Sequence, residues 1–262
     1  MKLLILGCGN MGGAMLTGWL AADLALSLTV VDPAVTDVPA TVRLLRKVPV
    51  ERFDVVLLGV KPQALASAAP ALAAVMTCET ILLSILAGAE LATLAAHFPV
   101  SGGIVRVMPS LAAAIGQSPI GLYADNLTQP ARAAITALLA PLGTPEWLAR
   151  EDMLDAVTAL AGSGPAFVYR FIEALAAGGA ALGLDPAQAQ RLALATVNGA
   201  AALAAAADEA PAELARRVTS AGGTTAAGLA VLDHEAALMR LVGDTLRAAC
   251  DRGAELAAAT RT

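Results

Sequence analysis

Six residues near the start of the chain have the types and spacing to hold the phosphates of a nucleotide. The pattern G-x-G-x-x-G follows four apolar residues and precedes a segment typical of a helix. The first glycine allows a tight turn, the second lets a pyrophosphate approach the backbone, and the third lets the helix pack on the strand. Free N–H groups at the helix start then attract the phosphates. We therefore expect a dinucleotide to be bound by Gly7, Cys8, Gly9, Asn10, Met11 and Gly12.

An acidic residue bears on the identity of this dinucleotide. Asp32 ends the next apolar run, 20 residues beyond Gly12. A carboxylate there can hydrogen-bond the ribose 2′-hydroxyl of NADH but repels the 2′-phosphate of NADPH. The residues at 33–35 supply no Arg or Ser in compensation. The cofactor is thus NADH or NADPH with a preference for NADH, and Arg43 could still fold across and favour NADPH.

Three further turns are expected to line the nicotinamide end of the site. Ligands of open α/β sheets bind beyond the carboxyl ends of the strands. Taken alone, each turn also fits an ordinary loop, and a methionine there fits a core position. The turns contribute Val60, Lys61, Pro62, Ala87, Gly88, Met108 and Pro109.

The elements that position these residues follow from the apolar pattern. Continuous apolar runs suit parallel strands buried on both faces, and they are found at residues 3–6, 28–31, 54–60, 80–85 and 103–107, with weaker edge runs at 118–124 and 145–148. From about Glu151, alanine-rich helical segments alternate with Gly and Pro signals. We expect an α/β fold with a Rossmann-type, doubly wound, mostly parallel sheet in residues 1–150. An all-helical domain should follow in residues 151–262, joined by one long helix starting near Glu151.

Composition excludes several classes of partner. The chain has 262 residues, a net charge of −5 and only 15% charged residues against 57% hydrophobic. Because about 25% charged residues is usual, a large subunit interface is expected. The acidic balance and few aromatic residues argue against nucleic-acid binding. The uncharged stretches at 62–78 and 192–207 contain polar residues and fall short of the roughly 20 apolar residues that span a membrane.

The N-terminal segment and the cysteines and histidines predict where the protein is located in the cell and whether it binds a metal. The apolar run at the N-terminus is too short for a signal peptide, so we expect a cytoplasmic protein. Cys8, Cys78 and Cys250 are widely scattered, and the two histidines do not add a ligand spacing. We therefore expect reduced thiols and no metal site.

Four segments together resemble the pyrroline-5-carboxylate reductase family, in order over nearly the whole chain. They are residues 5–12, the Val60-Lys61-Pro62 turn, residues 161–167 (AGSGPAF) and residues 218–225 (VTSAGGTT). The resemblance implies an oxidoreductase of proline biosynthesis, which reduces the C=N group of 1-pyrroline-5-carboxylate with NAD(P)H to give L-proline. It also implies a homodimer or ring of dimers built from swapped C-terminal helices, with each active site completed by the partner chain.

The same resemblance assigns the substrate site to the fourth segment. Backbone N–H groups would bind the substrate carboxylate, and the hydroxyl of Thr225 would face the ring nitrogen, which makes Thr225 the candidate catalytic residue. A Gly- and Ser/Thr-rich stretch that opens a helix attracts an anion without an Arg, although such residues also commonly serve as helix N-caps. The implied substrate residues are Ser220, Gly222, Gly223, Thr224 and Thr225.

Three departures from the family pattern keep alternatives open. Ala221 stands where the family usually has Pro, and residues 110–112 read Ser-Leu-Ala in place of Asn-Thr-Pro, which removes an amide and a hydroxyl near the nicotinamide. The segment between Asp32 and Asp54 contains no Asn, a common contact on the adenosine side. The alternatives are a reductase of a different cyclic imino acid and a catalytically weak NAD(P)-binding regulator. A hydroxyacid dehydrogenase fits poorly, because the helical half has no Lys to accept an alcohol proton.

Overall fold

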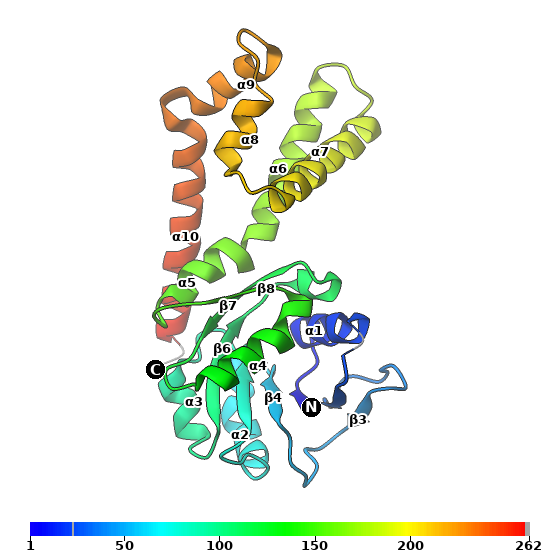
Figure 1. The fold of residues 1–262 in the computed structure, drawn as a ribbon, viewed down its shortest axis with the longest axis vertical. Coiled ribbons are helices and arrows are strands. Elements are labelled where there is room, and N and C mark those ends of the chain that lie inside the picture. Colours follow the sequence, from blue (N-terminus) through cyan, green and yellow to red (C-terminus); the bar gives the residue numbers. More distant parts are fainter. Residues whose placement is uncertain (23, 260–262) are drawn as a thin grey trace. The chain divides into compact units, whose positions relative to one another are not determined.

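The computed structural model describes residues 1–22 and 24–259, and this part of the chain divides into two compact units (Figure 1). The first unit comprises Met1–Gly162 together with the part of the chain from Ala249 onward, and the second comprises Ser163–Ala248. The assignment of residues 1–150 to a dinucleotide-binding domain and of residues 151–262 to a helical domain for substrate binding and dimerisation stays a prediction.

A mostly parallel sheet forms the centre of the first unit. Among the described residues it has eight strands, in the order β3-β2-β1-β4-β5-β6-β7-β8. Neighbouring strands are parallel except for β6 and β7, which are antiparallel. The expected Rossmann-type sheet is confirmed, while the three-residue β3 was too short to predict. The strands are β1 (Lys2–Leu6), β2 (Ser27–Val31), β3 (Arg43–Leu45), β4 (Val55–Leu58), β5 (Ile81–Ser84), β6 (Gly103–Met108), β7 (Ser118–Tyr123) and β8 (Gly143–Trp147).

Both faces of this sheet are buried, which explains the continuous apolar runs. In β1, Leu3 and Ile5 pack into one apolar cluster, whereas Leu4 and Leu6 pack into the other. Helices α1 (Asn10–Ala21) and α4 (Gln129–Leu139) supply side chains to the first cluster. Helices α2 (Leu65–Ala73) and α3 (Leu91–His97) supply side chains to the second. The crossover helices thus fix the strand ends around which the site is built.

The second unit is helical, as expected. Helices α6 and α7 pack against each other and are joined by a turn in which Gly183 has a φ of +102°. No helix in the described residues combines the length and apolarity needed to cross a membrane. The helices are α6 (Gly164–Ala181), α7 (Pro186–Ala206), α8 (Pro211–Arg217), α9 (Thr224–Asp233) and α10 (Ala237–Ala259), of which α10 continues into the first unit.

The single long helix expected from Glu151 is wrong. The chain instead forms α5 (Met153–Val157), then a π-helical turn over Thr158–Gly162, and α6 begins at Gly164. Pro165 lies in the first turn of α6, where its missing N–H group costs no hydrogen bond. Glycine and proline therefore start a new helix here.

Candidate active site

The glycine loop has the backbone geometry that a pyrophosphate requires. Gly7 has a φ of +91°, and a Cβ atom there would lie 2.6 Å from the carbonyl carbon of Gly59. A Cβ on Gly12 would lie 2.5 Å from the carbonyl oxygen of Gly7, so neither position has room for a side chain. A Cβ on Gly9, in contrast, would meet no atom within 4 Å. The structure therefore leaves open space beside Gly9, the second glycine of the loop.

The start of α1 offers unpaired donors to this space. Gly9 is the N-cap of α1, and the N–H group of Gly13 donates to the carbonyl oxygen of Gly9 at 2.7 Å. The N–H groups of Asn10, Met11 and Gly12 precede this first helical bond. Such groups, together with the helix dipole, form an anion site.

A cavity of about 650 Å³ adjoins the loop at the ends of β1, β2 and β4. Gly7, Gly9 and Val60 line it, together with Asp32 and three cationic residues. The cations favour an anionic ligand. Those cations are Arg46, Lys47 and Lys61.

Asp32 is buried, and its carboxylate accepts backbone hydrogen bonds. Oδ2 accepts from the N–H group of Cys8 at 2.7 Å, and Oδ1 accepts from those of Ala34 at 2.7 Å and Val35 at 3.2 Å. Burial alone would raise the pKa of this carboxyl, but these bonds and the charge of Arg46 outweigh it, so the pKa is lowered. Burial, followed by the charge of Asp32, raises the pKa of the Cys8 thiol. Asp32 is thus an anion held against the glycine loop.

The cation beside residues 32–35 is not the one considered from the sequence. Arg43 instead pairs with Glu51, with Nη1 and Oε1 2.5 Å apart. Nη1 of Arg46 donates to the carbonyl oxygens of Asp32 at 2.9 Å, Pro33 at 3.0 Å and Val35 at 2.6 Å. The unpredicted β3 places Arg46 there, because it pairs in parallel with β2 and ends one residue before Arg46.

A second cavity, of about 270 Å³, lies at the ends of β5 and β6. It gathers predicted residues from three separate turns, which supports their common placement at one end of the sheet. Pro109 is buried and lines neither cavity. The predicted residues that line this cavity are Pro62, Ala87, Gly88 and Met108.

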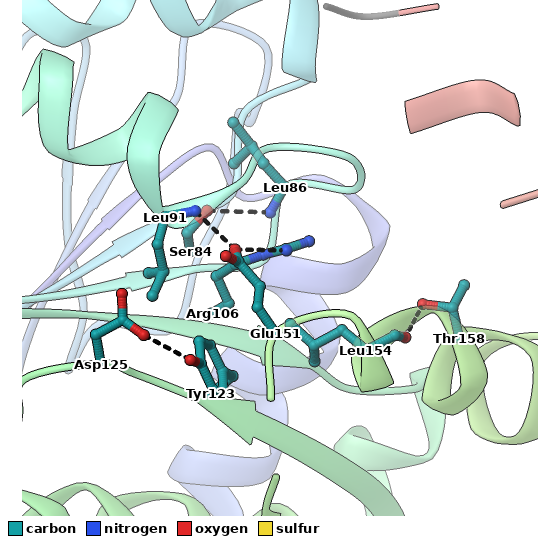
Figure 2. Close-up of polar contacts among 9 residues, drawn as sticks. All are labelled: Ser84, Leu86, Leu91, Arg106, Tyr123, Asp125, Glu151, Leu154 and Thr158. Carbon is teal, nitrogen blue, oxygen red and sulfur yellow. Dashed lines mark hydrogen bonds and ion pairs between the residues drawn. The ribbon is translucent and has the colours of Figure 1, made fainter. Parts of the chain in front are cut away.

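Sequence reasoning missed an ion pair beside this second cavity (Figure 2). Nη1 of Arg106, on β6, lies 2.8 Å from Oε1 of Glu151, and the same oxygen accepts the N–H group of Leu91 at 2.7 Å. The pair ties β6 to the start of α3 and to the segment that follows β8. A charged residue inside the apolar run 103–107 was the signal that could have found it.

Two further motif positions, Gly162 and Ser110, have defined neighbours in the first unit. A Cβ on Gly162 would lie 2.6 Å from Cε of Met108, so the motif at 161–167 begins against the predicted nicotinamide end. Ser110, where the family has Asn, is buried, and its N–H group donates to Oγ of Ser118 at 2.8 Å. Its Oγ lies 3.3 Å from Oγ of Ser118, the first residue of β7.

The predicted substrate loop lies in the second unit and ends at a helix start. Gly222 has a φ of +70°, and the N–H group of Gly223 donates to the carbonyl oxygen of Ser220 at 3.0 Å. Gly223 is the N-cap of α9, so the alternative that Thr224 or Thr225 caps this helix is wrong. Both threonines are exposed in the first turn.

The backbone N–H groups in the first turn of α9 are available to a ligand. The first helical bond runs from the N–H group of Ala227 to the carbonyl oxygen of Gly223 at 3.1 Å. The N–H groups of residues 224–226 precede it. Within the described residues, the hydroxyl of Thr225 has no hydrogen-bond partner. This turn can therefore bind a small carboxylate and present a hydroxyl beside it.

Comparisons with known proteins match each part of the chain to a family model. Residues 151–256 match the family model described as pyrroline-5-carboxylate reductase dimerisation, and residues 2–88 match that of the coenzyme F420-dependent NADP oxidoreductases. The pyrroline-5-carboxylate reductase of Pseudomonas aeruginosa is 41% identical over 205 residues, which cover 78% of this chain and 75% of the relative.

Solved structures match over almost the entire length. A pyrroline-5-carboxylate reductase from Coxiella burnetii gives a TM-score of 0.88 at 26% identity, covering 97% of each chain. The Plasmodium falciparum pyrroline carboxylate reductase with NADP bound gives a TM-score of 0.77 at 26% identity, also covering 97% of each chain.

Proposed function

Because this chain belongs to the pyrroline-5-carboxylate reductase family, we propose that it transfers a hydride from a nicotinamide cofactor to the C=N carbon of 1-pyrroline-5-carboxylate, which gives L-proline. The family predicted from the four segments is confirmed. The observation that carries the proposal is the combination of two anion sites, the glycine loop at the start of α1 and the loop before α9.

The substrate needs position more than activation. A protonated cyclic imine is already an electrophile, so the protein has mainly to hold it against the cofactor and hydrogen-bond its nitrogen. The N–H groups of Thr224 and Thr225 would bind the carboxylate, while Gly223, whose N–H group is engaged by Ser220, would shape the turn. The Thr225 hydroxyl would hydrogen-bond the ring nitrogen. When bound, the nicotinamide supplies the hydride.

The residues fit a nicotinamide cofactor. The glycine loop would hold the pyrophosphate, Asp32 the ribose, and Pro62, Ala87, Gly88 and Met108 the nicotinamide end. Lys61 would add a positive charge beside the phosphates. We propose that NADH is preferred, because the buried carboxylate of Asp32 repels a 2′-phosphate.

The helical domain supplies the subunit interface. The family's dimerisation domain supports oligomerisation of this chain. We propose a homodimer or ring of dimers through the C-terminal helices, in the cytoplasm, with the partner chain completing each active site and residues 151–262 acting as the substrate and dimerisation domain. Large apolar side chains exposed on α6, α7 and α10 support this proposal, among them Phe171, Leu192, Leu203 and Leu241.

The test is the initial rate of NADH and NADPH oxidation by the purified protein with 1-pyrroline-5-carboxylate, together with an assay for proline. Turnover that forms proline is the expected result. Absence of turnover with either cofactor, when both bind, would overturn the proposal. Other cyclic imines would then be assayed, and failure with these too would leave the regulator.

A further inference from the structure

The adenosine end of the cofactor cavity carries charges of both signs. The Asp32 carboxylate is turned toward the backbone, where it accepts N–H groups from Cys8, Ala34 and Val35. Its two oxygens are therefore largely engaged within the protein. Any repulsion between Asp32 and a 2′-phosphate therefore comes from a carboxylate that already accepts three backbone hydrogen bonds.

Arg46 is anchored on the other side of the same turn. All three of its hydrogen bonds to the carbonyl oxygens of residues 32, 33 and 35 are made by Nη1. A guanidinium group has five N–H donors in a planar fork. Its Nε and Nη2 groups donate to no atom in the described residues and remain for a ligand. Arg46 is exposed, and it lines the cavity together with Lys47.

We propose that Arg46 is the residue that determines cofactor specificity at this site, because its guanidinium group is placed to contact a 2′-phosphate. In a dinucleotide-binding fold, the end of the second strand is where the ribose 2′ position is read, and an Arg nearby accommodates a phosphate there. The anchored fork offers two parallel hydrogen bonds to phosphate oxygens, which a lysine cannot match. The inference rests on the proposed function only for the identity of the dinucleotide.

The experiment measures binding without turnover. Adenosine 2′,5′-bisphosphate and adenosine 5′-monophosphate differ only in the 2′-phosphate, so the ratio of their dissociation constants isolates that group. Calorimetric titration would give this ratio for the unmodified protein, for Arg46→Gln and for Arg43→Gln. Arg43 is the matched control, because its guanidinium pairs with Glu51 outside the cavity.

We expect Arg46→Gln to weaken binding of the bisphosphate relative to the monophosphate about tenfold or more, as usual for a charge-assisted contact. Arg43→Gln should leave the ratio of the two constants near that of the unmodified protein. With 1-pyrroline-5-carboxylate as substrate, the NADPH to NADH ratio of kcat/KM should fall similarly in Arg46→Gln. Arg46→Lys, which keeps the charge but not the fork, should lie between.

Three outcomes would overturn the proposal. Arg46→Gln could weaken both ligands equally, which would make Arg46 a purely structural anchor of the turn. Arg43→Gln could change the ratio as much as Arg46→Gln. The unmodified protein could bind the monophosphate and fail to bind the bisphosphate at all. None of these outcomes depends on the reaction, so failure of the proposed function remains distinguishable.

Discussion

Two glycines of the same loop have opposite tolerance for a side chain. Gly7 has a positive φ and lies against Gly59, whereas a Cβ on Gly9 would meet open space. We expect Gly9→Ala to raise KM for the cofactor about tenfold or more, because the methyl group occupies the space of the pyrophosphate, with little change in Tm. Gly7→Ala should lower stability by about 2 kcal/mol or more. An unchanged KM in Gly9→Ala would show that the pyrophosphate does not approach there.

Thr225 lies in the first turn of α9, and its hydroxyl has no hydrogen-bond partner among the residues that the structure describes. We expect Thr225→Ala to lower kcat about tenfold to a hundredfold, because the hydrogen bond to the imine nitrogen is lost. The dissociation constant of NADH should stay within about twofold, since the cofactor site is built from other residues. Thr225→Ser keeps the hydroxyl and should retain most of kcat. Equal kcat in the Ala variant and the unmodified protein would remove Thr225 from the mechanism.

Asp32 links stability to pH through its lowered pKa. A carboxyl whose pKa is lowered by folding adds stability that is complete above its unfolded pKa, about 4, and is lost as the pH falls through the folded value. Asp32→Ser removes this contribution and leaves backbone donors less satisfied. The difference in free energy of unfolding between the two proteins should therefore be largest near neutral pH and shrink below about pH 4. Urea unfolding at several pH values measures it, and a difference that grows in acid would contradict the assignment.

At the scale of elements, the ion pair of Arg106 and Glu151 joins β6 to the segment after β8. Its side chains are 13% and 28% exposed, whereas those of the neighbouring pair Arg150 and Asp152 are 70% and 68% exposed. Glu151→Ala should cost about 1–3 kcal/mol, because it leaves a half-buried guanidinium and the N–H group of Leu91 without an acceptor.

The matched control for this prediction is Asp152→Ala, which removes a solvent-screened pair and should change stability little. Urea unfolding of both variants gives the comparison. Equal losses in the two variants would show that the partly buried pair has no special role.

The elements themselves were predicted unequally well. Apolar runs predicted β1, β2 and β4 to β8, since strands of a doubly covered sheet are apolar throughout. The short β3 has no such run, and the supposed long helix is divided at Gly164 and Pro165. The conformation of β3 depends on its pairing with β2, and the helical segment is divided by a local break.

At the scale of the whole molecule, the helical domain needs a partner surface. Leu192 and Leu203 on α7 are 56% and 71% exposed. Burying a leucine contributes about 1.5–3 kcal/mol, and burying an unpaired charge costs more. We expect the variant Leu192→Glu/Leu203→Glu to sediment at a lower mass than the unmodified protein and to lose activity.

Val50→Glu is the control for this prediction, because Val50 is fully exposed in the first unit. It should leave both sedimentation and activity unchanged. If the double variant kept the mass of the unmodified protein, α7 would not form the interface.

The sequence by itself determined the features that depend on neighbouring residues. The glycine spacing, the apolar strands, the turns at their ends and the loop before α9 are encoded within a few residues, so a reader of the chain can recognise both the Rossmann-type domain and the family. Only the tertiary structure decided which charges meet. Arg46 reaches residues 32–35 because β3 pairs with β2, and Glu151 meets Arg106 across 45 positions of sequence. Such contacts depend on how distant strands are ordered in the sheet, which no local pattern specifies.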